Sequence, residues 1–251
     1  MKRAPFARRH PYWFVIILEI VVILVYLLAG TAAHFLGLSS LGLYGLANLA
    51  LTAVIVVVLT AMRWWWAIGY RAPDRSSDLL YYLAPFIPMF INLIPGVQIA
   101  GLGSFAEILA ITFMVGFVEE GIFRGLMLYA LKPSSPWKAA VITALLFGLT
   151  HALNVLAGKS VLENVLQIVY AVAIGFAYAA LVLRKGILWP LVLAHFAIDL
   201  VSFIQRPGFT FSTFWTVTIA ASLAVVFAVY GLFVMLQRSE TGGGEAETVG
   251  G

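Results

Sequence analysis

Residues 103–131 read GSFAEILAITFMVGFVEEGIFRGLMLYAL, an apolar run in which the only charged residues are Glu107, Glu119, Glu120 and Arg124. About 20 apolar residues in a helix span the hydrocarbon core of a bilayer, so this run is long enough to cross it. A charged side chain at that depth costs about 2.5–3.5 kcal/mol on insertion scales, and it therefore needs a partner, water or a chemical role. The run predicts a membrane helix that carries a functional site.

The composition of the whole chain is that of a membrane protein. Of its 251 residues, 63% are hydrophobic and 10% are charged, which leaves too little polar surface to coat a water-soluble globule of this size. The apolar runs do not alternate with polar residues, so helices are favoured over a β-barrel. We therefore predict an all-α, polytopic membrane protein with one helical bundle. The chain has no cysteine, which excludes disulfides, thiolate metal sites and cysteine nucleophiles.

Charged residues, prolines and glycines divide the chain into apolar segments, and we predict eight transmembrane helices. Their ranges are 12–37, 43–66, 79–95, 103–131, 137–157, 163–184, 187–204 and 212–237. Pro85 and Pro88 interrupt the short third segment, so a re-entrant or interfacial segment is the alternative to a full crossing there. Eight crossings leave only Lys159 and Arg206 on one side and place all other Lys and Arg residues of the loops and termini on the other. The positive-inside rule then favours eight spans with both termini in the cytoplasm.

The chain is expected to hold one transmembrane domain. This domain covers residues 1–238, and a glycine- and glutamate-rich tail at 239–251 is predicted to be disordered and cytoplasmic. The expected location is the plasma membrane of a prokaryote. The net charge of +4 comes from basic residues that stand singly between apolar runs, so the lipid bilayer is an expected partner and nucleic acid is not. The sequence leaves the oligomeric state open.

The fourth predicted helix contains a charged cluster, Glu119, Glu120 and Arg124. Glu120 and Arg124 are four residues apart and share one helix face, so they can form an ion pair. Glu119 lies about 100° around the helix and has no charged partner three or four residues further on, which leaves it free to face a cavity. Gly121 and Gly125 form a small-xxx-small step that would let a neighbouring helix approach closely.

The fifth and seventh predicted helices add two histidines. Phe147 and His151 are four residues apart in the fifth helix, and His195 and Asp199 have the same spacing in the seventh, where the carboxylate can orient the imidazole. Measured from the predicted cytoplasmic ends, Glu119, His151 and Asp199 lie about 18–21 Å along their helices, at 1.5 Å per residue. The similar depths predict one shared chamber.

These groups suit hydrolysis in two ways. A glutamate can take a proton from water while imidazoles hold the water or the developing oxyanion. The same groups suit Zn²⁺, with Glu119, His151 and His195 as ligands. Other intramembrane hydrolases fit poorly, because the chain has no His-Glu-x-x-His helix, no second aspartate in a predicted span and no serine in a nucleophile context. No cofactor fingerprint or phosphate-binding loop is present either.

Three motifs, each on a different predicted helix, resemble those of one known family. They are Glu-Glu-x-x-x-Arg at Glu119, Glu120 and Arg124, Phe-x-x-x-His at Phe147 and His151, and His-x-x-x-Asn/Asp at His195 and Asp199. In this order, over about residues 80–205, they resemble the CPBP intramembrane proteases, named for CAAX proteases and bacteriocin-processing enzymes and including the Ras-converting endopeptidase.

The resemblance implies an eight-helix endopeptidase that opens toward the cytoplasm and cleaves a membrane-anchored substrate, for example a prenylated CAAX-like peptide. The implied roles are water activation by Glu119 and His151, oxyanion stabilisation by His195 and Asp199, and geometric support or substrate binding by Glu120, Arg124 and Phe147. The family is described both as metal-dependent and as glutamic, so no cofactor is favoured and Zn²⁺ remains the alternative.

Two other functions use the same residues. In a non-catalytic membrane scaffold or regulator, they would act only as hydrogen-bonding groups between helices. In a proton-coupled transporter, intramembrane glutamate and histidine would form a proton relay, although no repeat or paired broken helices support this.

Overall fold

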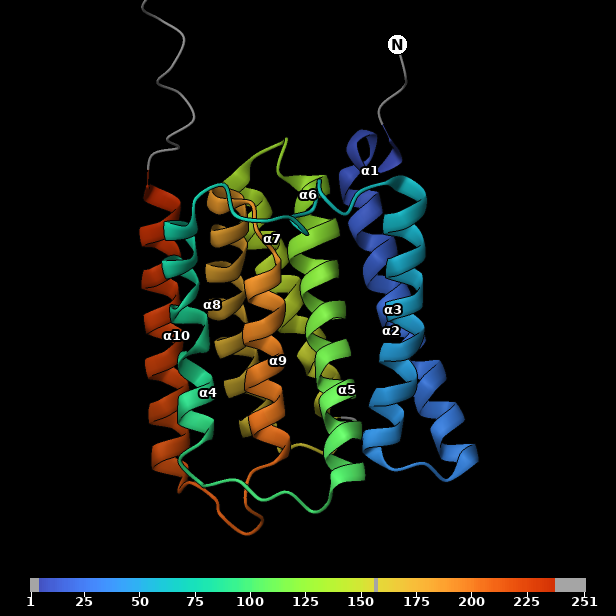
Figure 1. Ribbon diagram of the computed structural model, residues 1–251, viewed down its shortest axis with the longest axis vertical. Coiled ribbons are helices and arrows are strands. Elements are labelled where there is room, and N and C mark those ends of the chain that lie inside the picture. The colour runs from blue at the N-terminus through green and yellow to red at the C-terminus, as the bar shows by residue number, and fades with distance from the viewer. Residues whose placement is uncertain (1–4, 156–157, 238–251) are drawn as a thin grey trace, which may run out of the picture.

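The computed structural model describes residues 5–155 and 158–237, and this part of the chain is a bundle of helices (Figure 1). An isolated bridge between Val97 and Gln205 is the one β-type pairing within it. The prediction of an all-α protein is therefore confirmed. The predicted disordered tail, 239–251, lies outside the described residues.

Six helices are long and apolar enough to cross a membrane. They are Pro11–Leu36 (α2), Leu41–Met62 within α3 (Ser40–Met62), Leu102–Leu131, Pro136–Val155, Val161–Lys185 (α8) and Thr213–Leu236 (α10). The third of these runs continuously through α5 (Leu102–Glu120), a π-helical segment (Gly121–Met127) and α6 (Leu128–Leu131). The fourth comprises α7 (Pro136–Thr150) and a 3-10 turn (His151–Val155). A seventh helix, α9 (Trp189–Phe203), is apolar but shorter.

The segment predicted as a helix over 79–95 is broken. It consists of two 3-10 segments, Ser76–Tyr82 and Ala84–Phe86, followed by the short helix α4 (Ile87–Asn92). Pro85 and Pro88 explain the breaks, because proline has no N–H for the helical hydrogen bond and its ring clashes with the preceding turn. In Figure 1 this segment nevertheless follows α9 along the bundle.

The second predicted helix, 43–66, ends four residues early. Met62 is the last residue of α3, and Arg63 follows in the left-handed conformation with φ of 56°. Trp64 then turns inward, where its ring centroid lies 5.1 Å from that of Tyr129, so this residue packs inside the bundle.

Glycines set the closest helix contacts. A Cβ on Gly116 of α5 would lie 2.9 Å from the carbonyl oxygen of Val192 in α9, so only glycine permits this approach. Gly148 of α7 meets α8 in the same way, at Val172. Of the predicted small-xxx-small step, Gly121 meets Ile55 of the neighbouring helix α3, whereas Gly125 faces Ile68, in the segment after α3.

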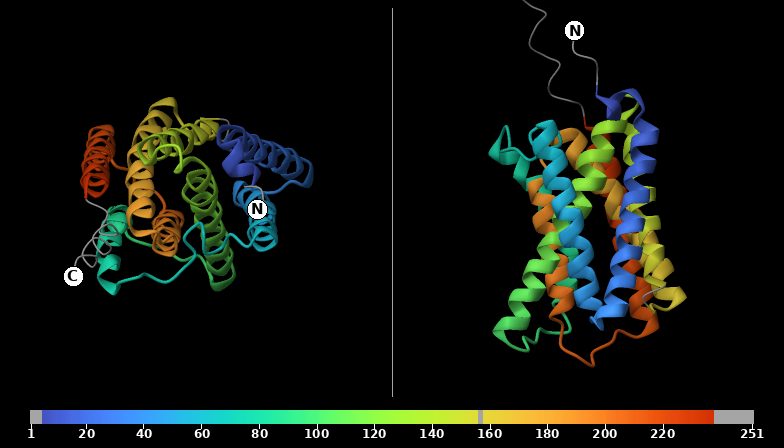
Figure 2. Two further views of the ribbon diagram at one scale, coloured as in Figure 1. Left: turned by 90° about the horizontal axis from the view of Figure 1, so that it is seen from above. Right: turned by 90° about the vertical axis from the view of Figure 1, so that its right-hand side faces the viewer.

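The helices are arranged around α5. Seen from above, the α2–α3 hairpin lies at one edge and α10 at the other, with α5 between them (Figure 2). Helix α5 contacts α9 on one side and α3 on the other. Helix α1 (Phe6–Arg9) and the last turn of α10 lie at the same end of the bundle (Figure 1). The ion pair between Lys185 and Asp78, at 2.8 Å, joins α8 to the broken segment.

Candidate active site

The Glu-Glu-x-x-x-Arg motif spans a change of helix type. Glu119 and Glu120 end the α-helical part of α5, and the π-helical segment begins at Gly121 and contains Arg124. A π-helix has one extra residue per hydrogen-bonded turn and is found mostly as a short insertion at functional sites. Arg124 still reaches back to Glu120, with 3.2 Å between Nη1 and Oε1. The ion pair expected from the spacing is present and fully buried.

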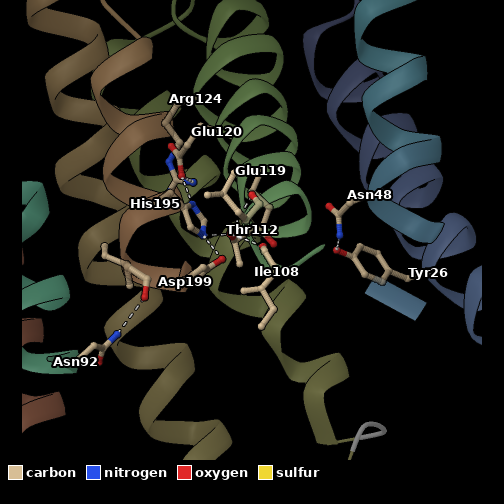
Figure 3. Close-up of polar contacts among 12 residues, drawn as sticks. Tyr26, Asn48, Asn92, Ile108, Thr112, Glu119, Glu120, Arg124, His195 and Asp199 are labelled. Carbon is tan, nitrogen blue, oxygen red and sulfur yellow. Dashed lines mark hydrogen bonds and ion pairs between the residues drawn. The ribbon is translucent and has the colours of Figure 1, made fainter. Parts of the chain in front are cut away.

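His195 is the centre of the polar cluster (Figure 3). Its Nδ1 lies 2.8 Å from Oε1 of Glu120, the same oxygen that receives the Arg124 hydrogen bond. Its Nε2 lies 3.6 Å from Oε2 of Glu119 and 3.6 Å from Oδ2 of Asp199. Because a carboxylate accepts hydrogen bonds, Nδ1 carries a proton and donates to Glu120. Nε2 is therefore directed toward the other two carboxylates.

The exposure of these groups divides them into an inner and an outer set. The side chains of Glu120 and Arg124 are 0% exposed, whereas those of Glu119 and Asp199 are 21% and 26% exposed. His195, at 13%, lies between them. Glu119 and Asp199 are therefore the partly exposed carboxylates of the cluster, although Oε2 of Glu119 is itself buried and has no hydrogen-bond partner among the described residues. The Glu120–Arg124 pair lies on the other side of the histidine.

The buried guanidinium of Arg124 is held by aromatic rings as well as by Glu120. Its carbon Cζ lies 3.9 Å from the ring centroid of Phe147 and 5.5 Å from that of Tyr178, distances at which cation–π attraction is effective. Gly175 of α8 makes room for it, because a Cβ there would lie 2.9 Å from Nη2. Gly175 and Tyr178 belong to none of the three motifs, so only their contacts in the structure assign them to the site.

His151 joins the site through Phe147 rather than through Glu119. The ring of Phe147 packs edge-on against His151 and against His195, with centroid distances of 4.9 and 6.1 Å. Nδ1 of His151 lies 2.8 Å from the carbonyl oxygen of Phe147. In the described part of the chain, no hydrogen bond or ion pair joins His151 to Glu119. Helix α7 ends at Thr150, so His151 lies in a 3-10 turn rather than inside the predicted helix 137–157.

The possible Zn²⁺ ligands do not form a metal site. Within residues 5–155 and 158–237, no group of three or more His, Asp or Glu side chains is placed to hold a metal ion. Both histidines hold Nδ1 in a hydrogen bond, His151 with the Phe147 carbonyl and His195 with Glu120, which leaves Nε2 of each ring as the nitrogen that could bind a metal. The described residues thus show no assembled three-ligand site.

Two further glutamates lie in the apolar runs. Glu19 of α2 accepts a hydrogen bond of 2.9 Å from the Thr150 hydroxyl, which joins α2 to α7. Glu107 lies near the start of α5 and is exposed. It has no hydrogen bond or ion pair with another described residue.

The comparison with known families agrees with this geometry. Residues 101–201 match the family of type II CAAX prenyl endopeptidases described as Rce1-like. The match covers α5 to most of α9 and contains all three motifs, so the resemblance inferred from them is confirmed. Together with the six helices long and apolar enough to cross a membrane, the match supports an integral membrane protein that is similar to CAAX proteases over these residues. No curated protein and no solved structure matches the chain.

Proposed function

We propose that the protein is an intramembrane endopeptidase that hydrolyses a peptide bond of a membrane-anchored substrate. The observation that carries the proposal is the convergence of Glu119, Glu120 and Asp199 on His195 inside an apolar bundle. A bundle held together by hydrogen bonds alone needs no partly exposed carboxylate beside a histidine. The family match over the same residues supports the same activity.

In the proposed mechanism, Glu119 is the general base. It takes a proton from a water molecule, and the resulting hydroxide attacks the carbonyl carbon of the scissile bond. The carbonyl oxygen becomes an oxyanion, which the protonated Nε2 of His195 stabilises. Glu119 then returns the proton to the leaving amine, and the C–N bond breaks. These steps use only the side chains named here and water.

The surrounding residues keep His195 in this role. Glu120 accepts from Nδ1, so the imidazole can be charged only when Nε2 also carries a proton. Asp199 faces Nε2–H and fixes the plane of the ring. His151 donates from Nδ1 to the Phe147 carbonyl, which leaves its Nε2 as an acceptor able to hold the attacking water.

The proposed substrate is a lipid-anchored peptide, such as a prenylated CAAX-like sequence, which reaches the site from the cytoplasmic side. This orientation assumes eight crossings with both termini in the cytoplasm. It is supported by the basic residues of α1, Arg8 and Arg9, which lie at the same end of the bundle as the end of α10. Glu119 lies 12 residues before Leu131, about 18 Å from this end along the helix.

The decisive experiment is Glu119→Gln in the purified protein, with cleavage of a prenylated CAAX peptide as the readout. Loss of general-base catalysis lowers kcat by about 10²–10⁴-fold. Glu107→Gln is the matched control, because it makes the same change in the same helix at an exposed residue, and it is expected to retain the parental rate. Cleavage by Glu119→Gln at the parental rate would overturn the proposal.

A further inference from the structure

A second polar pair, Tyr26 of α2 and Asn48 of α3, lies outside the residues matched by the family. Asn48 is fully buried in a mostly apolar helix. Its Nδ2 donates to the Tyr26 hydroxyl at 3.1 Å and to the Tyr44 carbonyl at 2.9 Å. Because a backbone carbonyl only accepts, this contact fixes which end of the side-chain amide is the nitrogen.

The pair leaves one acceptor and one donor unused. The Oδ1 atom of Asn48 is buried and has no hydrogen bond with any described residue. The Tyr26 oxygen accepts from Asn48, and its own proton is donated to no acceptor in the same part of the chain. Buried polar atoms are almost always hydrogen-bonded, so an orphaned acceptor with a fixed orientation needs an explanation.

The pair faces the catalytic cluster. Figure 3 shows Asn48 and Tyr26 on the opposite side of Glu119 from His195. Gly45 of α3 meets Ile111 and Ile55 of α3 meets Gly121, so Asn48 is level with the part of α5 that leads to Glu119. Both Glu119 and Asp199 interact electrostatically with the Tyr26 hydroxyl.

We infer that Tyr26 and Asn48 bind one peptide group of the substrate main chain beside the bond that is cleaved. The inference rests on the proposed endopeptidase function. A free acceptor next to a free donor complements a peptide group, which offers one N–H and one C=O. The substrate N–H donates to Oδ1 of Asn48, and the Tyr26 hydroxyl donates to the substrate C=O.

The membrane makes this contact necessary. A peptide in the hydrocarbon region has no bulk water, so its backbone groups must find partners in the protein. A prenyl chain has no donor or acceptor and would leave Asn48 and Tyr26 unsatisfied. The pair is therefore suited to the peptide portion of a lipid-anchored substrate and not to its lipid.

The competing explanation is that the pair only joins α2 to α3. The substitution Asn48→Leu cannot by itself separate substrate binding from this structural role, because it also removes the hydrogen bond between the helices. Binding is therefore measured in the Glu119→Gln protein, with a series of substrate peptides in which one backbone amide at a time is replaced by an ester. The ester lacks the N–H, so the replacement facing Asn48 weakens binding by about tenfold, the value of one hydrogen bond of about 1.4 kcal/mol.

The Asn48→Leu substitution is then combined with each ester. At the backbone position that faces Asn48, the ester is expected to weaken binding no further in the Asn48→Leu protein. At all other positions, the losses of binding caused by the ester and by Asn48→Leu are expected to add. Thr143→Val is the control, because its buried hydroxyl bonds only to carbonyls of its own helix, and its effect is expected to add at every position. Tyr26→Phe should weaken binding of the all-amide peptide, and the ester position that weakens binding should be the same as in the protein that keeps Tyr26.

Each outcome of this series decides the question. Additive effects of Asn48→Leu at every backbone position would overturn the inference and assign the pair a structural role. The proposed function is tested separately, since cleavage of the all-amide peptide by the parental protein precedes the binding series. A parental protein that cleaves while the effects stay additive leaves the protease intact and removes only the Tyr26–Asn48 subsite.

Discussion

His195 donates from Nδ1 to Glu120 across 2.8 Å, and Glu120 accepts from Arg124 with the same oxygen. One fully buried carboxylate therefore connects α9 to the π-helical part of the third long helix. Glu119, its neighbour in sequence, approaches the opposite nitrogen of the same ring. The two adjacent glutamates thus differ in their surroundings: Glu120 is fully buried and supports the histidine, and Glu119 is partly exposed on the other side of the ring, where we propose that it activates water.

The Glu120–Arg124 pair allows stability to be separated from activity. Glu120→Leu leaves the buried Arg124 without its counter-charge, which is expected to lower the free energy of unfolding by about 3–5 kcal/mol. The double variant Glu120→Leu/Arg124→Leu removes both charges and should recover most of that loss, as measured by thermal unfolding in detergent. Neither variant is expected to cleave the substrate, because Nδ1 of His195 has lost Glu120 as its hydrogen-bond acceptor. A double variant as active as the parental protein would contradict this assignment.

Asp199 is expected to tolerate replacement by asparagine. Its Oδ2 lies 3.6 Å from Nε2 of His195, which is too long for a tight hydrogen bond, so it orients the ring more than it shares a proton. Asp199→Asn keeps the shape and one oxygen, and kcat should fall by less than about tenfold. Asp199→Ala removes the contact and should lower kcat by about 10²-fold, since small displacements of a catalytic group are costly. Equal losses in the two variants would mean that the negative charge itself is needed.

The sequence predicts the local pairs well because helix geometry alone defines them. Glu120 with Arg124 and His195 with Asp199 are both four residues apart, and both are paired in the structure. The break in the third predicted segment is likewise readable, since Pro85 cannot continue a helix. These features depend on neighbours in sequence and not on how helices pack.

The contacts between helices are not predictable in this way. That His195 meets Glu120 depends on how far α9 slides along α5, and Gly116 sets this through a contact that no spacing rule identifies. The π-helical segment also shows no sequence signature, although it places Arg124 under the ring of Phe147. This packing brings Oε2 of Glu119 to 3.6 Å from Nε2 of His195, a contact that no spacing within one helix predicts.

Removal of metal ions should leave cleavage unchanged. The proposed steps use only side chains and water, and no set of three ligands is assembled among the described residues. Purified protein treated with a chelator such as 1,10-phenanthroline, and then freed of it, is expected to keep the parental kcat. Elemental analysis of the active protein should find zinc well below one ion per chain. Loss of activity that returns on adding Zn²⁺ would contradict the mechanism.

Gly116 offers a test of the helix packing that assembles the site. A Cβ at this residue would lie 2.9 Å from the Val192 carbonyl and 3.0 Å from the Phe196 nitrogen, so α9 must move away from α5. Both neighbours are backbone atoms, which cannot rotate aside as a side chain can. Gly116→Ala is therefore expected to shift His195 relative to Glu119 and to lower kcat by about 10²-fold, the effect of a displacement of about 1 Å.

The matched control for Gly116 is Gly103, in the first turn of the same helix. A Cβ on Gly103 meets nothing within 4 Å, so Gly103→Ala makes the same chemical change in α5 without moving a neighbour. Steady-state cleavage by the two variants, compared at equal folded fraction by gel filtration and thermal unfolding, isolates the effect of the α5–α9 distance. If Gly116→Ala cleaves as fast as Gly103→Ala, close contact between α5 and α9 is not what brings His195 to the glutamates. The position of α9 along α5 must then be set by another contact, such as the 3.3 Å hydrogen bond from Asn92 to the Ile198 carbonyl.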